Sequence, residues 1–218
     1  MNDKINKITR TAKITRNTKE TEINISICLD GAMNALGAMG SIVSDSPASG
    51  NISTGSGFLN HMLTLFAFHS GFALTVDARG DTDVDYHHIT EDIGITLGQC
   101  IKEALGGGVG ITRYASVFLP MDEALVLVAL DISGRAFLNY DVAINSPKIG
   151  DFDTELAQEF LTGLCRSLGL TLHVKLFYGM NAHHIIEALF KGLGRALGEA
   201  TKPDPTKHGT IPSTKGTL

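Results

Sequence analysis

Two short stretches of this sequence repeat one pattern of residues that can bind metal. Each stretch has a pair of histidines and a glutamate four residues after the first histidine. Residues i and i+4 share a face of a helix, so the first histidine and the glutamate of each stretch can bind one divalent cation together. The second histidine points elsewhere and is free for a second centre, and symmetry suggests that it serves the centre of the other stretch. The residues are His87, His88 and Glu91 in DVDYHHITEDIG, and His183, His184 and Glu187 in GMNAHHIIEALF.

The repeat extends beyond these two stretches. HHITEDIGITLGQCIKEA (87–104) aligns without gaps with HHIIEALFKGLGRALGEA (183–200). Upstream, Gly71 aligns with Gly169, and TEINISICLDG lies over DEALVLVALDIS so that Glu22 aligns with Glu123. The chain is therefore interpreted as two fused copies of one unit that share a core.

The alignment adds one metal-competent residue to each copy, because His61 aligns with Glu159 on otherwise apolar helices. Each residue would supply one more ligand to one centre. The complete set mixes imidazole and carboxylate groups and contains no thiolate, which suits manganese, iron or zinc. The order of residues differs from HExxH, in which the glutamate acts as a base, so Glu91 and Glu187 are interpreted as ligands.

Each copy is predicted to fold as strand, helix, strand, helix, which gives an α+β fold of two duplicated half-domains. Strands are expected over 22–30, 72–78, 113–120, 123–132, 135–142 and 170–178, and helices over 57–70, 88–105, 152–168 and 184–200. The predicted organisation is an N-terminal tail (1–17), a first half-domain (18–111) with an exposed variable loop (37–55), a second half-domain (112–203) and a C-terminal tail (204–218).

Composition excludes several classes of function. The 218 residues carry a formal net charge of −5 and no basic block, which gives no case for nucleic-acid binding. The sequence has no uninterrupted run of about eighteen apolar residues, so a membrane span is not expected. The N-terminus is basic and polar and lacks the apolar run of a secretory signal. Cys28, Cys100 and Cys165 are scattered in apolar stretches, as expected of core residues in a reducing compartment. The cytoplasm is therefore the expected location.

Several basic or hydroxyl residues are candidates for binding an anion. Arginine and lysine are the usual phosphate-binding side chains, although each one taken alone is more typical of a solvated surface charge. Together with two metal centres they indicate a phosphorylated small substrate. The candidates are Arg113, Arg135, Lys191, Ser213 and Lys215.

The motifs together resemble the imidazoleglycerol-phosphate dehydratase family of histidine biosynthesis. The stretches that carry the resemblance are GFLNHML, DYHHITEDIGITLGQ, DEALVLVALDISGR, DFDTELAQEF, LTLHVKLFYGMNAHHIIEALFKGLGRAL and GTIPSTKG. The resemblance implies a hydro-lyase that converts imidazoleglycerol phosphate into imidazole acetol phosphate, with two manganese ions per active site bridged by the substrate imidazole. It also implies a helical layer between two roughly four-stranded mixed sheets. It further implies trimers that assemble into a 24-subunit shell, with active sites completed across subunits and the C-terminal tail contributing to them.

The resemblance also implies roles for individual residues. The eight histidines and glutamates above, with His61 and Glu159 among them, match the metal positions of the family. Glu20 in RNTKET matches a glutamate implicated in proton transfer, and the anion-binding candidates match phosphate and substrate contacts. This chain departs from the family at Asn60 and Leu65, where aspartate and glutamine are usual, and at Glu159, where many members have histidine. Each departure keeps the ligand set, so activity is expected.

Two other readings of the metal pattern stay open at this point. A dinuclear metal hydrolase would use a bridging water to cleave a phosphate ester and would release inorganic phosphate. A non-catalytic protein would use the metals only to hold subunits together.

Overall fold

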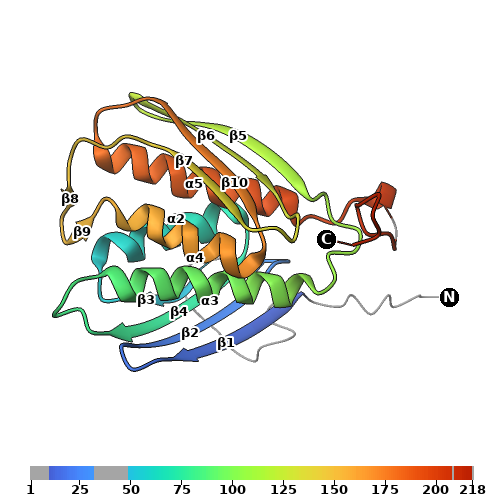
Figure 1. The fold of residues 1–218 in the computed structure, drawn as a ribbon, viewed down its shortest axis with the longest axis horizontal. Helices are drawn as coiled ribbons and strands as arrows, with labels where there is room; N and C mark the ends of the chain where they lie inside the picture. Colours follow the sequence, from blue (N-terminus) through green and yellow to red (C-terminus); the bar gives the residue numbers. More distant parts are fainter. Residues whose placement is uncertain (1–9, 32–48, 208, 218) are drawn as a thin grey trace.

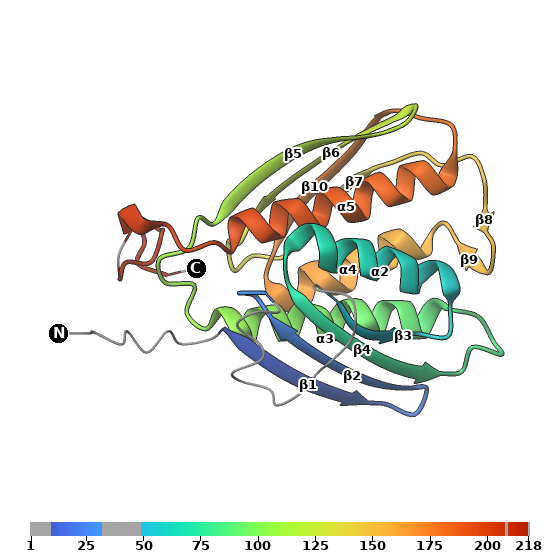
Figure 2. The ribbon, with the colours of Figure 1, turned by 180° about the vertical axis from the view of Figure 1, so that it is seen from behind.

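The structure, a computed structural model, describes residues 10–31, 49–207 and 209–217. Two four-stranded mixed sheets enclose a layer of helices, as Figures 1 and 2 show from opposite sides. The strand order is β1-β2-β4-β3 in the first sheet and β5-β6-β10-β7 in the second. In each sheet the last strand pairs in parallel and the others pair antiparallel. The predicted fold class is confirmed.

The two halves of the chain contribute matching elements. The first half comprises β1 (Thr11–Asn17), β2 (Thr21–Cys28), β3 (Ser49–Ser53), α2 (Gly57–Ser70), β4 (Ala73–Gly80) and α3 (His87–Leu105). The second half comprises β5 (Tyr114–Met121), β6 (Ala124–Asp131), β7 (Phe137–Asp141), α4 (Leu156–Leu168), β10 (Thr171–Tyr178) and α5 (Ala182–Ala200). The second half also carries the hairpin of β8 (Lys148–Ile149) and β9 (Phe152–Asp153), and the 3₁₀ turn η1 (Pro205–Lys207).

The helix ends fix how the two halves correspond. α2 ends at Gly71 and α4 ends at Gly169, both in the left-handed conformation, with φ of 75° and 76°. Glycine adopts this conformation without the penalty that a Cβ imposes. Each glycine leads into the next strand at the same distance, so Val76 of β4 corresponds to Val174 of β10.

The strand register then corrects one part of the sequence alignment. Val76 pairs with Ile25, and Val174 pairs with Val128, so Ile25 of β2 corresponds to Val128 of β6. Counting back at equal spacing makes Glu20, and not Glu22, the counterpart of Glu123. The sequence alignment was two residues out of register here. A slip of two residues leaves the alternation of inward and outward side chains unchanged, so the hydrophobic pattern alone could not detect it.

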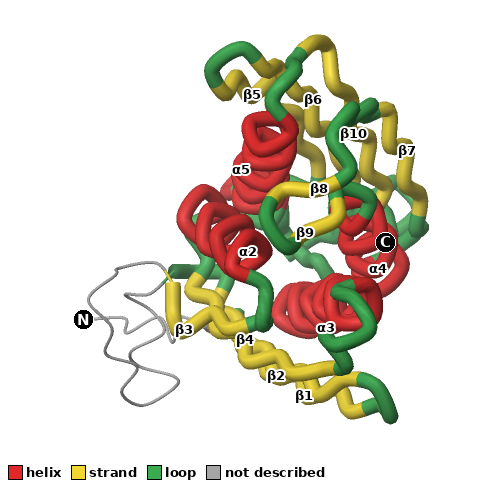
Figure 3. Tube along the Cα trace, turned by 90° about the vertical axis from the view of Figure 1, so that its left-hand side faces the viewer, coloured by secondary structure: helices red, strands yellow, loops and turns green. Residues whose placement is uncertain are grey.

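The helices of the two halves pair with each other across the core. α3 packs on α4, and α2 packs on α5, as the end-on view in Figure 3 shows. Glycines allow these close approaches: a Cβ on Gly94 would lie 2.3 Å from the carbonyl oxygen of Phe160, and one on Gly194 would lie 2.7 Å from that of Phe66. Each helix pair thus joins one half to the other, and the halves share one hydrophobic core.

Three predicted segments differ in the structure. Thr11–Asn17, assigned to the N-terminal tail, forms β1, because its inward Ala12 and Ile14 alternate with Lys13 and Thr15. Ser49–Ser53, assigned to the variable loop, forms β3 by pairing with β4, a long-range contact that local composition does not encode. The helix predicted from 152 begins at Leu156. Residues 1–9 and the loop segment 37–48 lie outside the described residues, and the half-domain boundaries stay a prediction.

The longest of the described helices, α3 and α5, have 19 residues each. Within the described ranges, no helix combines the length and the apolar composition needed to cross a bilayer.

Candidate metal centre and active site

The predicted metal ligands gather at one end of the helical layer. α2, α3, α4 and α5 all begin on the left in Figure 1 and run to the right. Every predicted ligand lies within about two turns of one of these helix starts. The ligands are His61 on α2, His87, His88 and Glu91 on α3, Glu159 on α4, and His183, His184 and Glu187 on α5.

Three of these residues converge on one point. The ligand atoms of His61, His183 and Glu187 all lie within 4.8 Å of one another. Glu187 Oε2 is 3.1 Å from His183 Nε2 and 3.6 Å from His61 Nε2. The packing of α2 on α5 brings His61 to the i, i+4 pair that the sequence predicted. Two imidazoles and a carboxylate suit manganese, iron or zinc, so the residues present fit the metal that the sequence predicts.

The carboxylate at the centre of this cluster is held in its charged form. Glu187 is buried, and its second oxygen, Oε1, lies 2.5 Å from Lys191 Nζ. Burial acts to raise the pKa of Glu187, but the hydrogen bond and charge of Lys191, together with His183, outweigh burial and lower the pKa below its usual value. An ionised carboxylate is the form that coordinates a cation.

The start of α5 is fixed by contacts on both sides of His183. The side chain of Asn181 caps the helix and accepts hydrogen bonds from the backbone N–H groups of His183 and His184. Phe58 meets the His183 ring edge-on at a centroid distance of 5.2 Å, and Phe152 of β9 packs on Phe58 at the same distance. The β8–β9 hairpin crosses the helix starts in Figure 3.

The matching trio of the first half is arranged more openly. Gly163 of α4 packs on α3, where a Cβ would lie 2.8 Å from the carbonyl oxygen of Glu91. Glu159 is one turn earlier on the same face, which puts it beside the first turn of α3 and His87. In the part of the chain that the structure describes, only the cluster of His61, His183 and Glu187 closes to metal-binding distance.

His88 and His184, the second histidine of each pair, are oriented by carboxylates. His88 Nδ1 lies 3.0 Å from Asp81 Oδ2, and His184 Nδ1 lies 2.7 Å from Glu123 Oε2. The hydrogen bond to Asp81 raises the pKa of His88, and the bond to Glu123 raises the pKa of His184. The hydrogen bonds engage Nδ1 of each ring, and His184 Nε2 lies 3.7 Å from Asp122 Oδ2. Among the described residues, neither ring joins the cluster of His61, His183 and Glu187 within one chain.

Glu20 lies close to the His88 side of the site. Its Oε2 is 3.8 Å from His88 Nδ1, and its side chain is largely exposed. The turn that carries Glu20 is held by Thr18, whose hydroxyl accepts hydrogen bonds from the N–H groups of Glu20 and Thr21. Thr21 in turn donates to the buried Asp92 of α3, which ties the turn to the helix of His88.

Most of the predicted anion-binding residues lie at the opposite end of the molecule. Arg113 binds both carboxylate oxygens of Asp131 and donates to the carbonyl oxygen of Pro212, so it anchors the C-terminal tail with Ser213 and Lys215. This tail lies beyond the end of α5 in Figure 1. α5 has 19 residues and is about 28 Å long. Of the predicted set, only Lys191 is near the metal cluster within one chain.

Comparison with known proteins settles the family. The model of the family described as "Imidazoleglycerol-phosphate dehydratase" matches residues 54–197. The chain is 53% identical over 209 residues to the imidazoleglycerol-phosphate dehydratase of Xanthobacter autotrophicus, covering 96% of this chain and 98% of the relative. It is 51% identical over 209 residues to that of Listeria welshimeri, covering 96% and 100%. The chain belongs to the imidazoleglycerol-phosphate dehydratase family.

Solved structures of imidazoleglycerol-phosphate dehydratases agree. The Staphylococcus aureus structure matches with a TM-score of 0.73 at 41% identity, covering 88% of this chain and 99% of the other. The Pyrococcus furiosus structure, in complex with (S)-C348, matches with a TM-score of 0.76 at 41% identity, covering 94% and 100%. The predicted family and the predicted enzyme class, a dehydratase and hence a hydro-lyase, are confirmed.

Sequence reasoning missed three carboxylates that contact the predicted metal ligands or the turn of Glu20. Asp81, Glu123 and Asp92 were assigned no role, although Glu123 stands in the quoted stretch DEALVLVALDISGR. The correct alignment of β2 with β6 was the signal that could have found Glu123, because it places Glu123 at the position equivalent to Glu20. Asp81 follows β4 in a polar turn, where composition gives no sign of a contact to His88.

Proposed function

We propose that the protein removes water from imidazoleglycerol phosphate and gives imidazole acetol phosphate, a step of histidine biosynthesis, with two manganese ions per active site. The single observation that carries the proposal is the cluster of His61, His183 and Glu187 in a member of this family. The cluster supplies nitrogen and oxygen donors of the kind that manganese accepts.

The two centres would use the predicted ligands in a symmetric way. One centre takes His183 and Glu187 with His61, and the other takes His87 and Glu91 with Glu159. His88 and His184 each complete the centre of the opposite repeat, which they reach from a neighbouring copy of the chain. Bound metals would supply Lewis-acid stabilisation of charge on the imidazole ring of the substrate.

Glu20 is the proposed general base. The hydroxyl leaves from the substrate carbon next to the ring, and Glu20 takes the proton from the following side-chain carbon, which gives the enol of the keto product. Its exposed carboxylate is available for this role, while the Thr18 hydroxyl accepts hydrogen bonds from the N–H groups of Glu20 and Thr21. General bases contribute about 10²–10⁴-fold to rate when positioned against the reacting proton. Lys191, beside the metal cluster, and Arg113, Arg135, Ser213 and Lys215 are the proposed substrate and phosphate contacts.

The distance between these groups supports a site built from more than one chain. The tail with Ser213 and Lys215 is anchored at the far end of α5, so a neighbouring copy must bring it to the metal ligands. Self-association through trimers to a 24-subunit shell would supply that neighbour. The outer face of the second sheet is rich in exposed apolar side chains, Phe118 and Phe177 among them, as expected of a surface that a second copy covers.

A cytoplasmic location is part of the same proposal. The three cysteines are free and buried, as expected in a reducing compartment.

The direct test is product analysis with imidazoleglycerol phosphate. Protein stripped with a chelator is expected to be inactive, and added Mn²⁺ is expected to restore formation of the keto product. Release of inorganic phosphate would favour the phosphate-ester hydrolase, and full turnover by metal-free protein would overturn the proposal.

A further inference from the structure

The turns that connect the first two strands of each half carry corresponding glutamates. β1 pairs with β2, and β5 pairs with β6, in the same register, since Ile14 faces Ile25 and Val117 faces Val128. The two turns therefore have the same length, and Glu20 occupies the place that Glu123 occupies in the second half. Each glutamate lies beside the second histidine of its own half.

The two glutamates make different contacts. Glu123 Oε1 accepts hydrogen bonds from the backbone N–H groups of Met180 and Asn181, at 3.2 and 2.8 Å, and its Oε2 lies 2.7 Å from His184 Nδ1. Both oxygens of Glu123 are thus engaged by the segment that starts α5. Glu20 Oε2 stays 3.8 Å from His88 Nδ1, beyond hydrogen-bond distance.

In the first half another residue binds the histidine. Asp81, which follows β4, lies 3.0 Å from His88 Nδ1. At the end of β10 the chain instead continues through Gly179, where a Cβ would lie 2.8 Å from the Cβ of Ala124. The β-bulge between Leu176 and Tyr178 shifts the register of β10 by one residue, so Asp81 corresponds to Met180 and the second half has no carboxylate at that position. In each half one carboxylate makes a hydrogen bond to the second histidine. In the first half it comes from the turn after β4, and in the second half from the turn between β5 and β6.

A carboxylate on Nδ1 has a defined effect on a ligand histidine. It accepts the proton on Nδ1, which selects the tautomer with a lone pair on Nε2 and fixes the plane of the ring. His184 with Glu123 and His88 with Asp81 both have this arrangement. Among the described residues, the carboxylate of Glu20 makes no side-chain hydrogen bond and approaches His88 Nδ1 only at 3.8 Å.

We propose that Glu123 is the positioning residue of His184 and that its hydrogen bond to Nδ1 turns Nε2 towards a metal. In the first half Asp81 makes this hydrogen bond to His88, so Glu20 does not have the positioning role. The proposal rests on the proposed function in one respect, the assignment of His184 as a ligand. It explains why one of two corresponding glutamates can act as a base whereas the other cannot.

A purely structural role for Glu123 is the alternative, because the same carboxylate also binds the backbone ahead of α5. The two roles separate in a double-mutant cycle for Mn²⁺ binding. A structural residue would weaken the site whether or not His184 is present. A positioning residue acts only through His184, so its removal has no further effect once His184 is changed.

The experiment is a titration of the full-length, metal-stripped protein with Mn²⁺. The concentration of free Mn²⁺ is measured at each step from its electron paramagnetic resonance signal. The variants are Glu123→Ala, Glu123→Gln, His184→Gln and the double variant Glu123→Ala/His184→Gln. Glu199→Ala is the matched control, since this exposed glutamate of α5 pairs only with Lys202 among the contacts found in the described residues. Melting temperatures of the metal-free proteins check that each variant is folded.

Glu123→Ala is expected to weaken Mn²⁺ binding about 10–100-fold, the usual effect of removing a carboxylate behind a ligand histidine. Glu123→Gln, which keeps an acceptor for Nδ1–H and for the backbone, is expected to fold like the parent and to lose less affinity. The double variant is expected to bind as His184→Gln does, and the control as the parent does.

Unchanged affinity in both Glu123 variants would overturn the proposal, as would an additive loss in the double variant. Unchanged affinity in His184→Gln would overturn the ligand assignment and the inference with it, whereas a loss there with intact binding in the Glu123 variants would overturn the inference alone.

Discussion

The outer faces of the two sheets differ far more than their inner faces. Both sheets bury the same kind of aliphatic residue against the helices, such as Ile25 in the first and Val128 in the second. At two corresponding outward positions, the residue is polar on the first sheet and apolar on the second. Thr15 and Asn24 on the first sheet correspond to Phe118 and Leu127 on the second.

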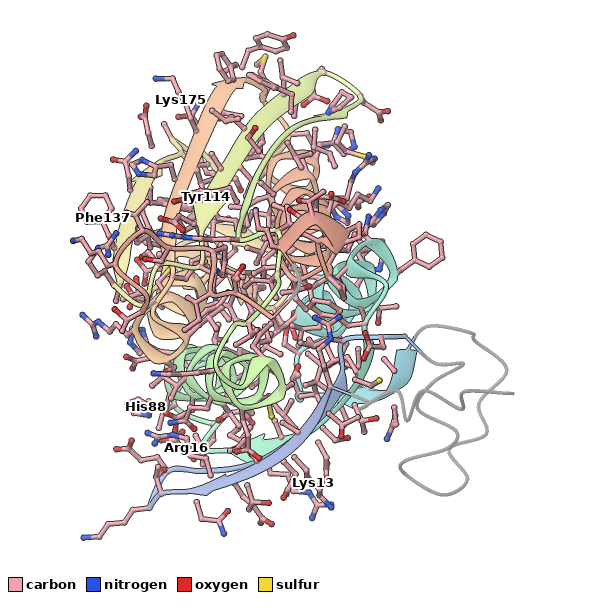
Figure 4. The ribbon with its side chains drawn as sticks, turned by 90° about the vertical axis from the view of Figure 1, so that its right-hand side faces the viewer. Lys13, Arg16, His88, Tyr114, Phe137 and Lys175 are labelled. Carbon is pink, nitrogen blue, oxygen red and sulfur yellow. The ribbon has the colours of Figure 1, made fainter. Side chains whose placement is uncertain are left out.

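The two outer faces differ in how their side chains are paired. On the first sheet Thr15 hydrogen-bonds to Asn24 across the strands, and Figure 4 shows Lys13 projecting from its outer side. On the second sheet Phe118 and Phe177 pack together at a ring-centroid distance of 5.6 Å while 61% and 46% exposed. Duplication kept the surface that builds the core and let the outer surfaces diverge, which agrees with the proposal that a second copy of the chain covers the second sheet.

Within the described residues, the inner layer also differs in an ion pair that only the first half has. Arg16 of β1 forms an ion pair with the buried Asp92 of α3, at 2.8 Å. The corresponding residues of the second half are Leu119 and Ala188, both buried and apolar. The ion pair is found in the half that carries Glu20, where it ties the turn of the proposed base to the helix of His88.

The largest expected difference between the halves is in the chemical step. Glu20→Gln is expected to lower kcat by about 10²–10⁴-fold, because the carboxylate that accepts the proton is lost. Mn²⁺ content should not change. Steady-state kinetics with metal analysis makes the test, with Glu22→Gln, two residues along the same turn and strand, as the control. An unchanged kcat in Glu20→Gln would exclude Glu20 as the base.

Assembly is expected to depend on one sheet only. Phe118→Asp places a charge in the apolar outer face of the second sheet and is expected to break the oligomer into smaller species, since burial of that charge is unfavourable. Thr15→Asp, at the corresponding place on the first sheet, should leave the assembly intact. Light scattering coupled to gel filtration measures both. Equal behaviour of the two variants would contradict the asymmetry.

The ion pair is expected to give a smaller effect. Asp92→Ala leaves Arg16 unpaired and removes the acceptor of the Thr21 hydroxyl, and it should lower the free energy of unfolding by about 1–3 kcal/mol. This is below the cost of breaking a fully buried pair, because a third of the Arg16 side chain is exposed. Arg16→Leu/Asp92→Ala copies the residues of the second half and should recover most of the loss. Denaturant unfolding measures both variants, and a double variant no better than the single one would contradict the comparison.

The smallest effect concerns the buried thiols, where the halves should behave alike. Burial raises the pKa of Cys100 and that of Cys165 to about 12, from 9.0 in a free thiol. The unfolded thiols ionise first as pH rises, so their contribution to stability is complete below pH 9.0 and is lost as pH approaches about 12. Both should resist a thiol reagent at neutral pH until the protein unfolds. Rapid labelling of either thiol in the native protein would contradict the shared core.

The sequence predicted what depends on local pattern. Helical spacing predicted α2 to α5, and the repeat predicted His61, His183 and Glu187 as metal ligands without showing that these three lie together. Contacts between distant segments could not be predicted from the sequence. β3 forms by pairing with β4, and Asp81 contacts His88 from the turn after β4. The two-residue slip that hid the equivalence of Glu20 and Glu123 has the same origin, since alternation repeats every two residues.

The most direct measurement counts the metal ions bound by this doubled scaffold. After the metal-stripped protein is loaded with Mn²⁺ and passed over a gel-filtration column, elemental analysis should find about two ions per chain, since each repeat supplies one helix-borne ligand pair. One ion per chain would mean that only the cluster around Glu187 binds metal, and would contradict the claim that both halves build a centre.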